Sequence, residues 1–365
     1  MHCKKLDEQV ARREPPLAKL LDQFVCVRIV QANGMDLSLF QFDYDQTWAA
    51  FFLNADRTIY GRYGSRSNKD GMQDVSIEGF RKAMEGALEL HKHYPANKQS
   101  LAGKTGPAPT FAAPERYPSL RRFSATVAPG GPRHNNKCIH CHQVHAAEVN
   151  YLRAAKLPIL DKELWSYPMP DQLGLKLDSA ERATVKTVTA GSPADKAGFR
   201  AGDKILQLEG QPIISIADVQ WVLHQANEPS QVKVQVERVG REMELNLSIA
   251  SGWRRQGDFS WRDSTCGWAV ARFNSADLSL ADRKRLGLHG DALALMVDFV
   301  GIEIKNSGLN KKDVIVEVDG QRNRLTESEL LAYVARSKAP GDELSVTVLR
   351  AGRELKLKVA IHDVR

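Results

Sequence analysis

The sequence predicts an α/β domain followed by two small mixed α+β domains, each a partly open barrel. Three observations predict this architecture. Residues 1–95 alternate helix-like and strand-like segments, residues 96–133 are rich in proline, glycine and alanine, and the pattern of residues 198–210 recurs at 308–320. A chain of 365 residues is long enough for about two to four domains of ordinary size.

The composition is that of a globular protein, with 42% hydrophobic and 26% charged residues. No run of about 18 apolar residues occurs, which predicts that no helix spans a membrane. The formal net charge is +7, and most of the excess lies between Lys98 and Lys137, where seven basic residues accompany one acid, Glu115. A solvated basic linker over residues 96–133 explains this charge without a nucleic-acid partner, and an acidic partner is the alternative.

Residues 1–95 read as an ordered succession of helix, strand, helix, strand, strand and helix. These elements are predicted at residues 4–13, 24–30, 36–42, 48–53, 58–63 and 77–93. Pro15 prevents the first helix from continuing, and Phe24–Val30 is a β-branched apolar run, typical of a central buried strand. The two later strands are joined by a short polar turn and predict a hairpin. Ser76 caps the last helix.

This order of elements, and the segment from Phe51 to Tyr63, resemble a thioredoxin fold that lacks its first strand. In that family a Cys-x-x-Cys opens the first helix, and Cys3 has the place of its second cysteine. The resemblance implies a redox thiol at Cys3, where a helix dipole lowers a thiol pKa; an ordinary unpaired terminal cysteine is the reading we favour. Because the first strand, the first cysteine and a signal peptide are missing, we expect that the natural protein is longer and that Met1 is a misassigned or engineered start.

Residues 134–167 contain the sequence Cys-Ile-His-Cys-His, which is the attachment signature of c-type haem. Cys138 and Cys141 would form thioether bonds to haem c, and His142 would ligate its iron. A zinc site that uses both thiolates, or a bare dithiol with no cofactor, is the alternative.

The second axial ligand of the haem iron is expected from a loop further along the chain. Met169, in the sequence Tyr-Pro-Met-Pro, resembles the methionine loop of class I cytochromes c; His134 is an alternative. Haem attachment in bacteria requires export, so we expect a periplasmic or extracytoplasmic location. The residues after Met1 have no apolar core of a signal peptide, which agrees with a truncated start.

Residues 168–250 carry the most specific pattern of the chain. Ser192 and Pro193 begin a short helix as its cap and first residue, and Gly198 ends it. This segment, the strand that follows it, and the earlier sequence Leu-Gly-Leu-Lys-Leu at 173–177 resemble bacterial PDZ domains of the high-temperature-requirement protease type.

The resemblance implies that the C-terminal peptide of another protein adds as a strand beside Leu175, against the helix of residues 216–225. Backbone amides near Gly174 would hold the carboxylate of the peptide. The residues implied in peptide binding are Leu173, Gly174, Leu175, Val219, Val222 and Leu223.

Residues 264–365 repeat the pattern in a second, degenerate PDZ-like domain. Its cap-and-helix segment is reduced, and the loop Leu286–His289, read as its carboxylate-binding loop, is followed by Gly290 and Asp291. These departures put peptide binding by this domain in doubt.

Proteases with such PDZ domains carry a serine protease domain, and nothing in this sequence resembles its nucleophile motif. We therefore expect a periplasmic binding and redox protein, in which the PDZ domains select protein C-termini and the haem exchanges electrons with an unknown redox partner. The alternatives are a thiol–disulfide oxidoreductase or chaperone with a truncated active site, and a scaffold with a zinc or dithiol site.

Overall fold

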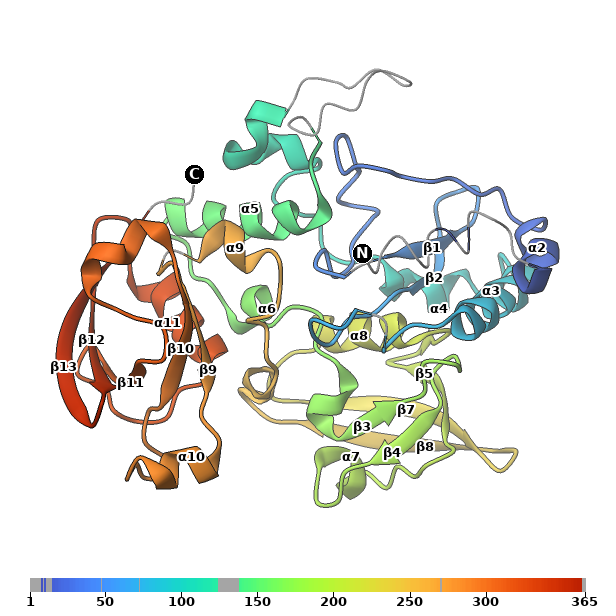
Figure 1. Cartoon of the computed structure of the whole chain (residues 1–365). Coiled ribbons are helices and arrows are strands. Elements are labelled where there is room, and N and C mark those ends of the chain that lie inside the picture. The colour runs from blue at the N-terminus through green and yellow to red at the C-terminus, as the bar shows by residue number, and fades with distance from the viewer. Residues whose placement is uncertain are drawn as a thin grey trace. The chain divides into compact units, whose positions relative to one another are not determined.

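The computed structural model describes residues 8, 10, 15–46, 48–71, 73–123, 138–269 and 271–362 (Figure 1). The chain divides into two compact units. The first unit consists of Met1–His145 and Trp165–Gly257, and the second of Ala146–Leu164 and Asp258–Arg365. In the described part of the chain, no helix combines the length and the apolar character that crossing a membrane requires. Cys3 and the helix predicted at 4–13 lie largely outside the described residues.

The N-terminal part of the first unit is a hairpin packed on a helix. Its elements are α2 (Pro15–Leu21), β1 (Ala50–Leu53), β2 (Ile59–Tyr63) and α3 (Ile77–Lys92). The predicted hairpin is confirmed, because β1 and β2 pair antiparallel with Phe51 opposite Arg62. The predicted cap is also confirmed: Gly79 N donates to Ser76 Oγ over 2.9 Å. Phe52, Phe80 and Met84 belong to one buried core between the sheet and α3.

The strand predicted at Phe24–Val30 is wrong. Residues 25–30 have no regular structure, and Val25 and Val27 are 96% and 83% exposed. A β-branched run becomes a strand only where neighbouring strands pair with it, and the sheet of this region consists, among the described residues, of β1 and β2. The segment predicted as a helix at 36–42 likewise forms turns. Of the elements predicted for residues 1–95, the structure thus contains the hairpin and α3, and it does not show a thioredoxin-like domain.

Residues 98–123 differ from the solvated linker that was predicted there. They form the helical segments α4 (Lys98–Leu101), η1 (Ala102–Lys104), η2 (Pro114–Arg116) and η3 (Pro118–Phe123). Leu101 and Lys104 are 1% and 0% exposed. The segment is ordered because its apolar residues are buried and because Lys104 finds an acidic partner, described below.

The remainder of the first unit is the predicted first PDZ-like domain. Its elements are η4 (Pro170–Leu173), β3 (Leu175–Leu177), β4 (Val185–Val188), α7 (Pro193–Lys196), β5 (Lys204–Leu208), β6 (Gln211–Pro212), α8 (Ile216–Gln225), β7 (Ser230–Arg238), β8 (Arg241–Ile249) and η5 (Trp253–Gln256). β3 pairs with β4, and a second sheet has the order β6-β5-β7-β8. Pro193 is the first residue of α7 and Ser192 its cap, as predicted.

The second unit is built on one five-stranded sheet in the order β13-β12-β11-β10-β9. Its elements are α5 (Cys141–Ala154, from Ala146 on), α6 (Asp161–Leu164), α9 (Thr265–Trp268), β9 (Phe273–Asp277), α10 (Leu280–Arg285), β10 (Leu295–Val300), η6 (Ile302–Ser307), β11 (Val314–Val318), α11 (Glu327–Ser337), β12 (Glu343–Arg350) and β13 (Arg353–Ala360). The order of β10, β11, α11, β12 and β13 repeats that of β4, β5, α8, β7 and β8.

The loop Leu286–His289, read as the carboxylate-binding loop of the second PDZ-like domain, does not precede the first strand of that domain. Leu286–His289 follows α10, between β9 and β10. The residue that precedes the first strand is Arg272, with φ +57°, where the first domain has Gly174 with φ +85°. The sequence Leu-Gly-Leu misled the prediction because it occurs in both places, whereas the backbone position that matters is the one before the first strand.

Candidate functional site

Two features of the structure require a glycine in the loop that precedes β3. η4 ends at Gly174, whose φ of +85° favours glycine. A Cβ at this position would lie 2.1 Å from Ser192 Oγ. The loop therefore rests directly on the cap of α7, and no side chain fits between them.

Strand β3 has an edge that is open to strand addition. Leu175 is opposite Val188 and Lys176 is opposite Thr187 in its pairing with β4. Within the described ranges β4 is the one strand that pairs with β3, so its second edge presents unpaired backbone groups. Such an edge can take an extended peptide as a further strand.

The structure brings the six predicted peptide-binding residues to one place. Gly174 lies in the loop, and the other five belong to a single apolar core: Leu173, Leu175, Val219, Val222 and Leu223. Each of the five is at most 4% exposed. An apolar ligand side chain matches this environment, but it has to displace part of the packing in order to enter.

Helix α8 is held at both of its ends. At the start, Asp218 N donates to Ser215 Oγ over 3.2 Å, which satisfies one of the free amides. At the end, Nη2 of the buried Arg254 donates to the carbonyls of Leu223 and Ala226 over 3.0 and 2.8 Å. A cation at this end also interacts favourably with the helix dipole. The wall of the predicted peptide site is thus fixed in place.

A buried ion pair supports α8 from the side of the N-terminal segment. Lys104 Nζ lies 3.0 Å from Asp218 Oδ2, and the two side chains are 1% and 0% exposed. Asp218 also accepts hydrogen bonds from the amides of Arg62 and Ile214, each over 3.1 Å. Burial lowers the pKa of the Lys104 ammonium, and the Asp218 carboxylate opposes this effect. Buried charges require such pairing.

Arg62 makes a second contact with the same helix. Its Cζ lies 3.9 Å from the ring centroid of Trp221, a cation–π geometry. Burial lowers the pKa of Arg62 to about 10. Trp221 Nε1 in turn donates to Gly103 O over 2.8 Å. Sequence reasoning missed these partners because they are far apart in the chain, and only the cap at Ser215 gave a local signal.

The electrostatics of the loop depend on Asp171. Burial raises the pKa of its carboxyl, and Lys176, whose Nζ lies 3.5 Å from Asp171 Oδ1, lowers it. A negative charge in this loop opposes the carboxylate of a peptide, whereas the backbone amides and Lys176 favour it.

The second PDZ-like domain differs at the equivalent edge. Ser275 N of β9 donates to Glu327 Oε1 over 2.9 Å, so a backbone amide of this strand is already bound by a side chain of the same domain. Glu327 follows the cap Thr326 as Ile216 follows the cap Ser215. Among the described residues, no side chain forms a hydrogen bond with the backbone of β3. The first domain is therefore the better candidate for binding a peptide.

Among the described residues, the structure shows no haem site at Cys138, Cys141, His142 and Met169. The Cys138 thiol donates to Gln31 Oε1 over 3.2 Å, and Cys141 and His142 begin α5. Met169, the predicted second axial ligand, is 8% exposed and belongs to the apolar core of the first PDZ-like domain. In the part of the chain that the structure describes, no group of three or more His, Cys, Asp or Glu side chains is placed to hold a metal ion.

Comparison with known proteins identifies the two repeated domains. Residues 171–249 and 303–361 match the family model described as PDZ domain. A probable periplasmic serine endoprotease DegP-like of Pseudomonas savastanoi pv. phaseolicola is 28% identical over 180 residues, which are 48% of this chain and 37% of that protein. A protein of the same description from Pseudomonas putida is 29% identical over 183 residues, with the same coverage. The chain thus spans 37% of the length of these relatives.

Among solved structures, the PDZ domain of HtrA3 bound to a phage-derived ligand is 19% identical, covers 20% of this chain and 63% of that chain, and has a TM-score of 0.17. The serine endoprotease from Yersinia pestis is 24% identical, covers 21% of this chain and 28% of that chain, and has a TM-score of 0.20.

Residues 171–249 and 303–361 thus match PDZ domains, and the similar proteins are described as DegP-like endoproteases. The predicted periplasmic location is confirmed by the relatives, which are described as periplasmic. The predicted haem redox function is wrong, because the relatives are described as serine endoproteases and Met169 is packed in a PDZ core. The predictions of haem c and of electron transfer are wrong for the same reason. The redox partner has no support, and the alternatives of a thiol–disulfide oxidoreductase and of a scaffold with a zinc or dithiol site stay untested predictions. A five-residue motif is short enough to occur without a haem.

Proposed function

We propose that the first PDZ domain binds the C-terminal peptide of another protein as a strand added to β3. The observation that carries the proposal is the open edge of β3 beside the loop at Gly174. In the second PDZ domain, Glu327 already occupies the amide of Ser275 on the equivalent strand. In this proposal, the carboxylate of the peptide lies at the backbone amides of the loop. The side chain of the last peptide residue enters the apolar core formed by Leu173, Leu175, Val219, Val222 and Leu223.

The chemistry of the site favours a ligand with an apolar last residue. The five buried side chains around the entry point are all aliphatic, and burying an aliphatic side chain contributes about 1.5–3 kcal/mol. Backbone hydrogen bonds to β3 supply affinity that does not depend on sequence. The proposal also takes the location as periplasmic, where the ligand would be an exposed protein C-terminus.

Isothermal titration calorimetry on the full chain tests the proposal with two decapeptides. Both end in valine, and one carries a free carboxylate while the other carries a C-terminal amide. We expect the amide to bind at least about tenfold more weakly, since a hydrogen-bonded charged group contributes about 1.5–3 kcal/mol. Equal binding of the two peptides, or no binding of either, would contradict the proposal.

The matched variant for this experiment is Gly174→Ala. The added Cβ would lie 2.1 Å from Ser192 Oγ, so the loop has to shift and the carboxylate form should lose binding. Gly240→Ala is the control, because Gly240 also has a positive φ, +71°, but a Cβ there meets nothing within 4 Å. A thermal unfolding curve for each variant separates loss of binding from loss of the fold.

A further inference from the structure

The proposed peptide site has a defined direction along β3. With its carboxylate at Gly174, a bound peptide runs toward Leu177 and the turn that follows. β3 has only three residues. The turn at 178–182 then folds the chain back toward β4, with Asp178 N donating to Thr184 O over 2.9 Å. Strand pairing with the peptide therefore ends at this turn.

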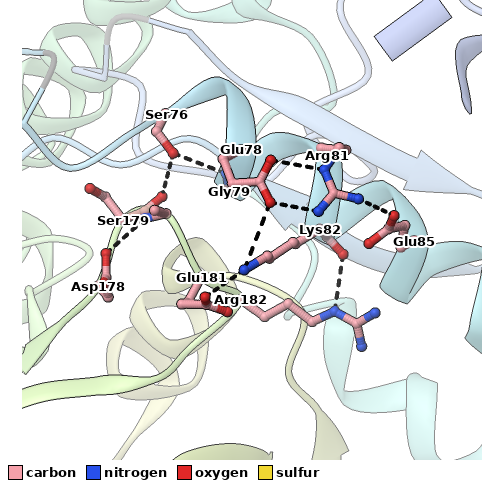
Figure 2. A network of polar contacts seen from close by, with 11 residues as sticks. Ser76, Glu78, Gly79, Arg81, Lys82, Glu85, Asp178, Ser179, Glu181 and Arg182 are labelled. Carbon is pink, nitrogen blue, oxygen red and sulfur yellow. Dashed lines mark hydrogen bonds and ion pairs between the residues drawn. The ribbon is translucent and has the colours of Figure 1, made fainter. Parts of the chain in front are cut away.

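Helix α3 of the N-terminal segment lies against the same turn (Figure 2). Ser76 Oγ donates to Ser179 O over 2.8 Å, and Arg182 Nε donates to Lys82 O over 3.0 Å. A Cβ at Gly79 would lie 2.2 Å from Ser179 O. The helix and the turn are thus in direct contact, with no space between them at this point.

Two ion pairs fix the turn on the helix. Lys82 pairs with Glu181, as Figure 2 shows. Arg182 donates two hydrogen bonds of 2.8 Å to the carboxylate of Glu89, the bidentate geometry that gives the most specific pairing. Each pair is partly exposed, so its contribution is mainly to position the turn rather than to stabilise it.

The opposite wall of the site meets α3 as well. Ile214 lies just before α8 and is buried in the core of the N-terminal segment. A Cβ at Gly86 would be 2.9 Å from Ile214 Cγ2 and 3.3 Å from Arg182 Cζ. One point on α3 therefore touches both the turn after β3 and the start of α8, which are the two sides of the peptide site at this end.

We propose that α3 forms an end wall of the peptide site, where Gly79 and Gly86 of the helix meet Ser179, Arg182 and Ile214. This inference rests on the proposed peptide binding. The end wall limits strand addition to the length of β3, after which the bound chain has to turn into solvent. The ligand is therefore a short, flexible C-terminal tail of a protein. Residues further from the carboxylate add no affinity, and an internal strand, which continues in both directions, is excluded.

Fluorescence anisotropy on the full chain tests the end wall with two labelled peptides that share their last four residues, a tetrapeptide and a decapeptide ending in valine. We expect dissociation constants within about twofold of each other. Without an end wall, each additional backbone hydrogen bond would tighten the decapeptide about fivefold. A decapeptide that binds tenfold or more tightly would overturn the end wall and leave the proposed function intact. If neither peptide binds, both proposals are overturned.

The variant that tests the contacts is Lys82→Met combined with Arg182→Met, which removes the two ion pairs between the turn and α3 and leaves the hydrogen bond from Ser76 to Ser179. We expect the decapeptide to gain about fivefold over the tetrapeptide, because the turn is then able to move away from α3. Arg200→Met is the matched control, an exposed arginine of the same domain, and should leave the ratio unchanged. An unchanged ratio in the double variant would contradict the assignment of the wall to these contacts.

Discussion

Replacing Lys104 with methionine tests whether a buried ion pair holds the N-terminal segment to the first PDZ domain. Methionine keeps the length and the apolar stem of the side chain but removes its charge. The Asp218 carboxylate, 0% exposed, then loses its cation. Breaking a buried pair by removing one partner costs about 3–5 kcal/mol, since the remaining charge is uncompensated.

The structure places the expected value at the lower end of this range. Asp218 keeps its hydrogen bonds from the amides of Arg62 and Ile214, which compensate part of the charge. We therefore expect Lys104→Met to lower the free energy of unfolding of the first unit by about 3 kcal/mol, which raises its unfolded fraction about 100-fold. Urea unfolding followed by tryptophan fluorescence measures this value, because Trp221 stacks on Arg62.

Two further variants complete the experiment. Lys98→Met removes a lysine that pairs with Asp56 at the surface, with side chains 59% and 39% exposed, and should cause no measurable change. Adding Asp218→Asn to Lys104→Met removes the uncompensated charge and should restore part of the lost stability. The reasoning is refuted if Lys104→Met unfolds at the same urea concentration as the wild type, or if the double variant is no more stable than Lys104→Met alone.

Three other predictions concern single positions. Glu327→Ala should raise the rate of amide hydrogen exchange in β9 about tenfold, because the Ser275 amide loses its charged acceptor. Hydrogen-exchange mass spectrometry measures this rate, and Glu327→Gln, which keeps an acceptor, should leave the rate unchanged. Burial raises the pKa of Asp171, so this carboxyl is neutral below that pKa and negative above it: the affinity for a peptide carboxylate should rise as the pH falls through it, and Asp171→Asn should give a flat profile in calorimetry. Gly61→Ala should destabilise the first unit by about 1–3 kcal/mol through overpacking, because a Cβ would lie 2.4 Å from a buried isoleucine. Gly290→Ala, where the nearest atom is 3.6 Å away, should be neutral in thermal unfolding.

The failure of the haem prediction has a physical reason. The sequence Cys-Ile-His-Cys-His describes ligands that are neighbours in the chain, and it says nothing of what surrounds them. The second axial ligand has to come from a distant segment, and the structure buries Met169 in the core of a PDZ domain instead. A local motif can name donors, but only the packing of distant residues decides whether a complete site exists.

By itself, the sequence determined the features that depend on residues a few positions apart. The caps at Ser76 and Ser192, the hairpin of β1 and β2, and the repeat of the PDZ pattern followed from rules that act within one turn or one strand pair. The PDZ pattern also predicted the peptide-binding residues around Gly174, and their role in binding a peptide stays a prediction.

Only the tertiary structure decided which surfaces meet across long stretches of the chain. The pair of Lys104 and Asp218 and the close contacts of Gly79 and Gly86 have no signal in their local sequence. Phe24–Val30 has the composition of a buried strand, yet it is largely exposed because no strand among the described residues pairs with it. Charge pairing and strand pairing require partners that are distant in sequence, and the fold alone determines which of them come within reach.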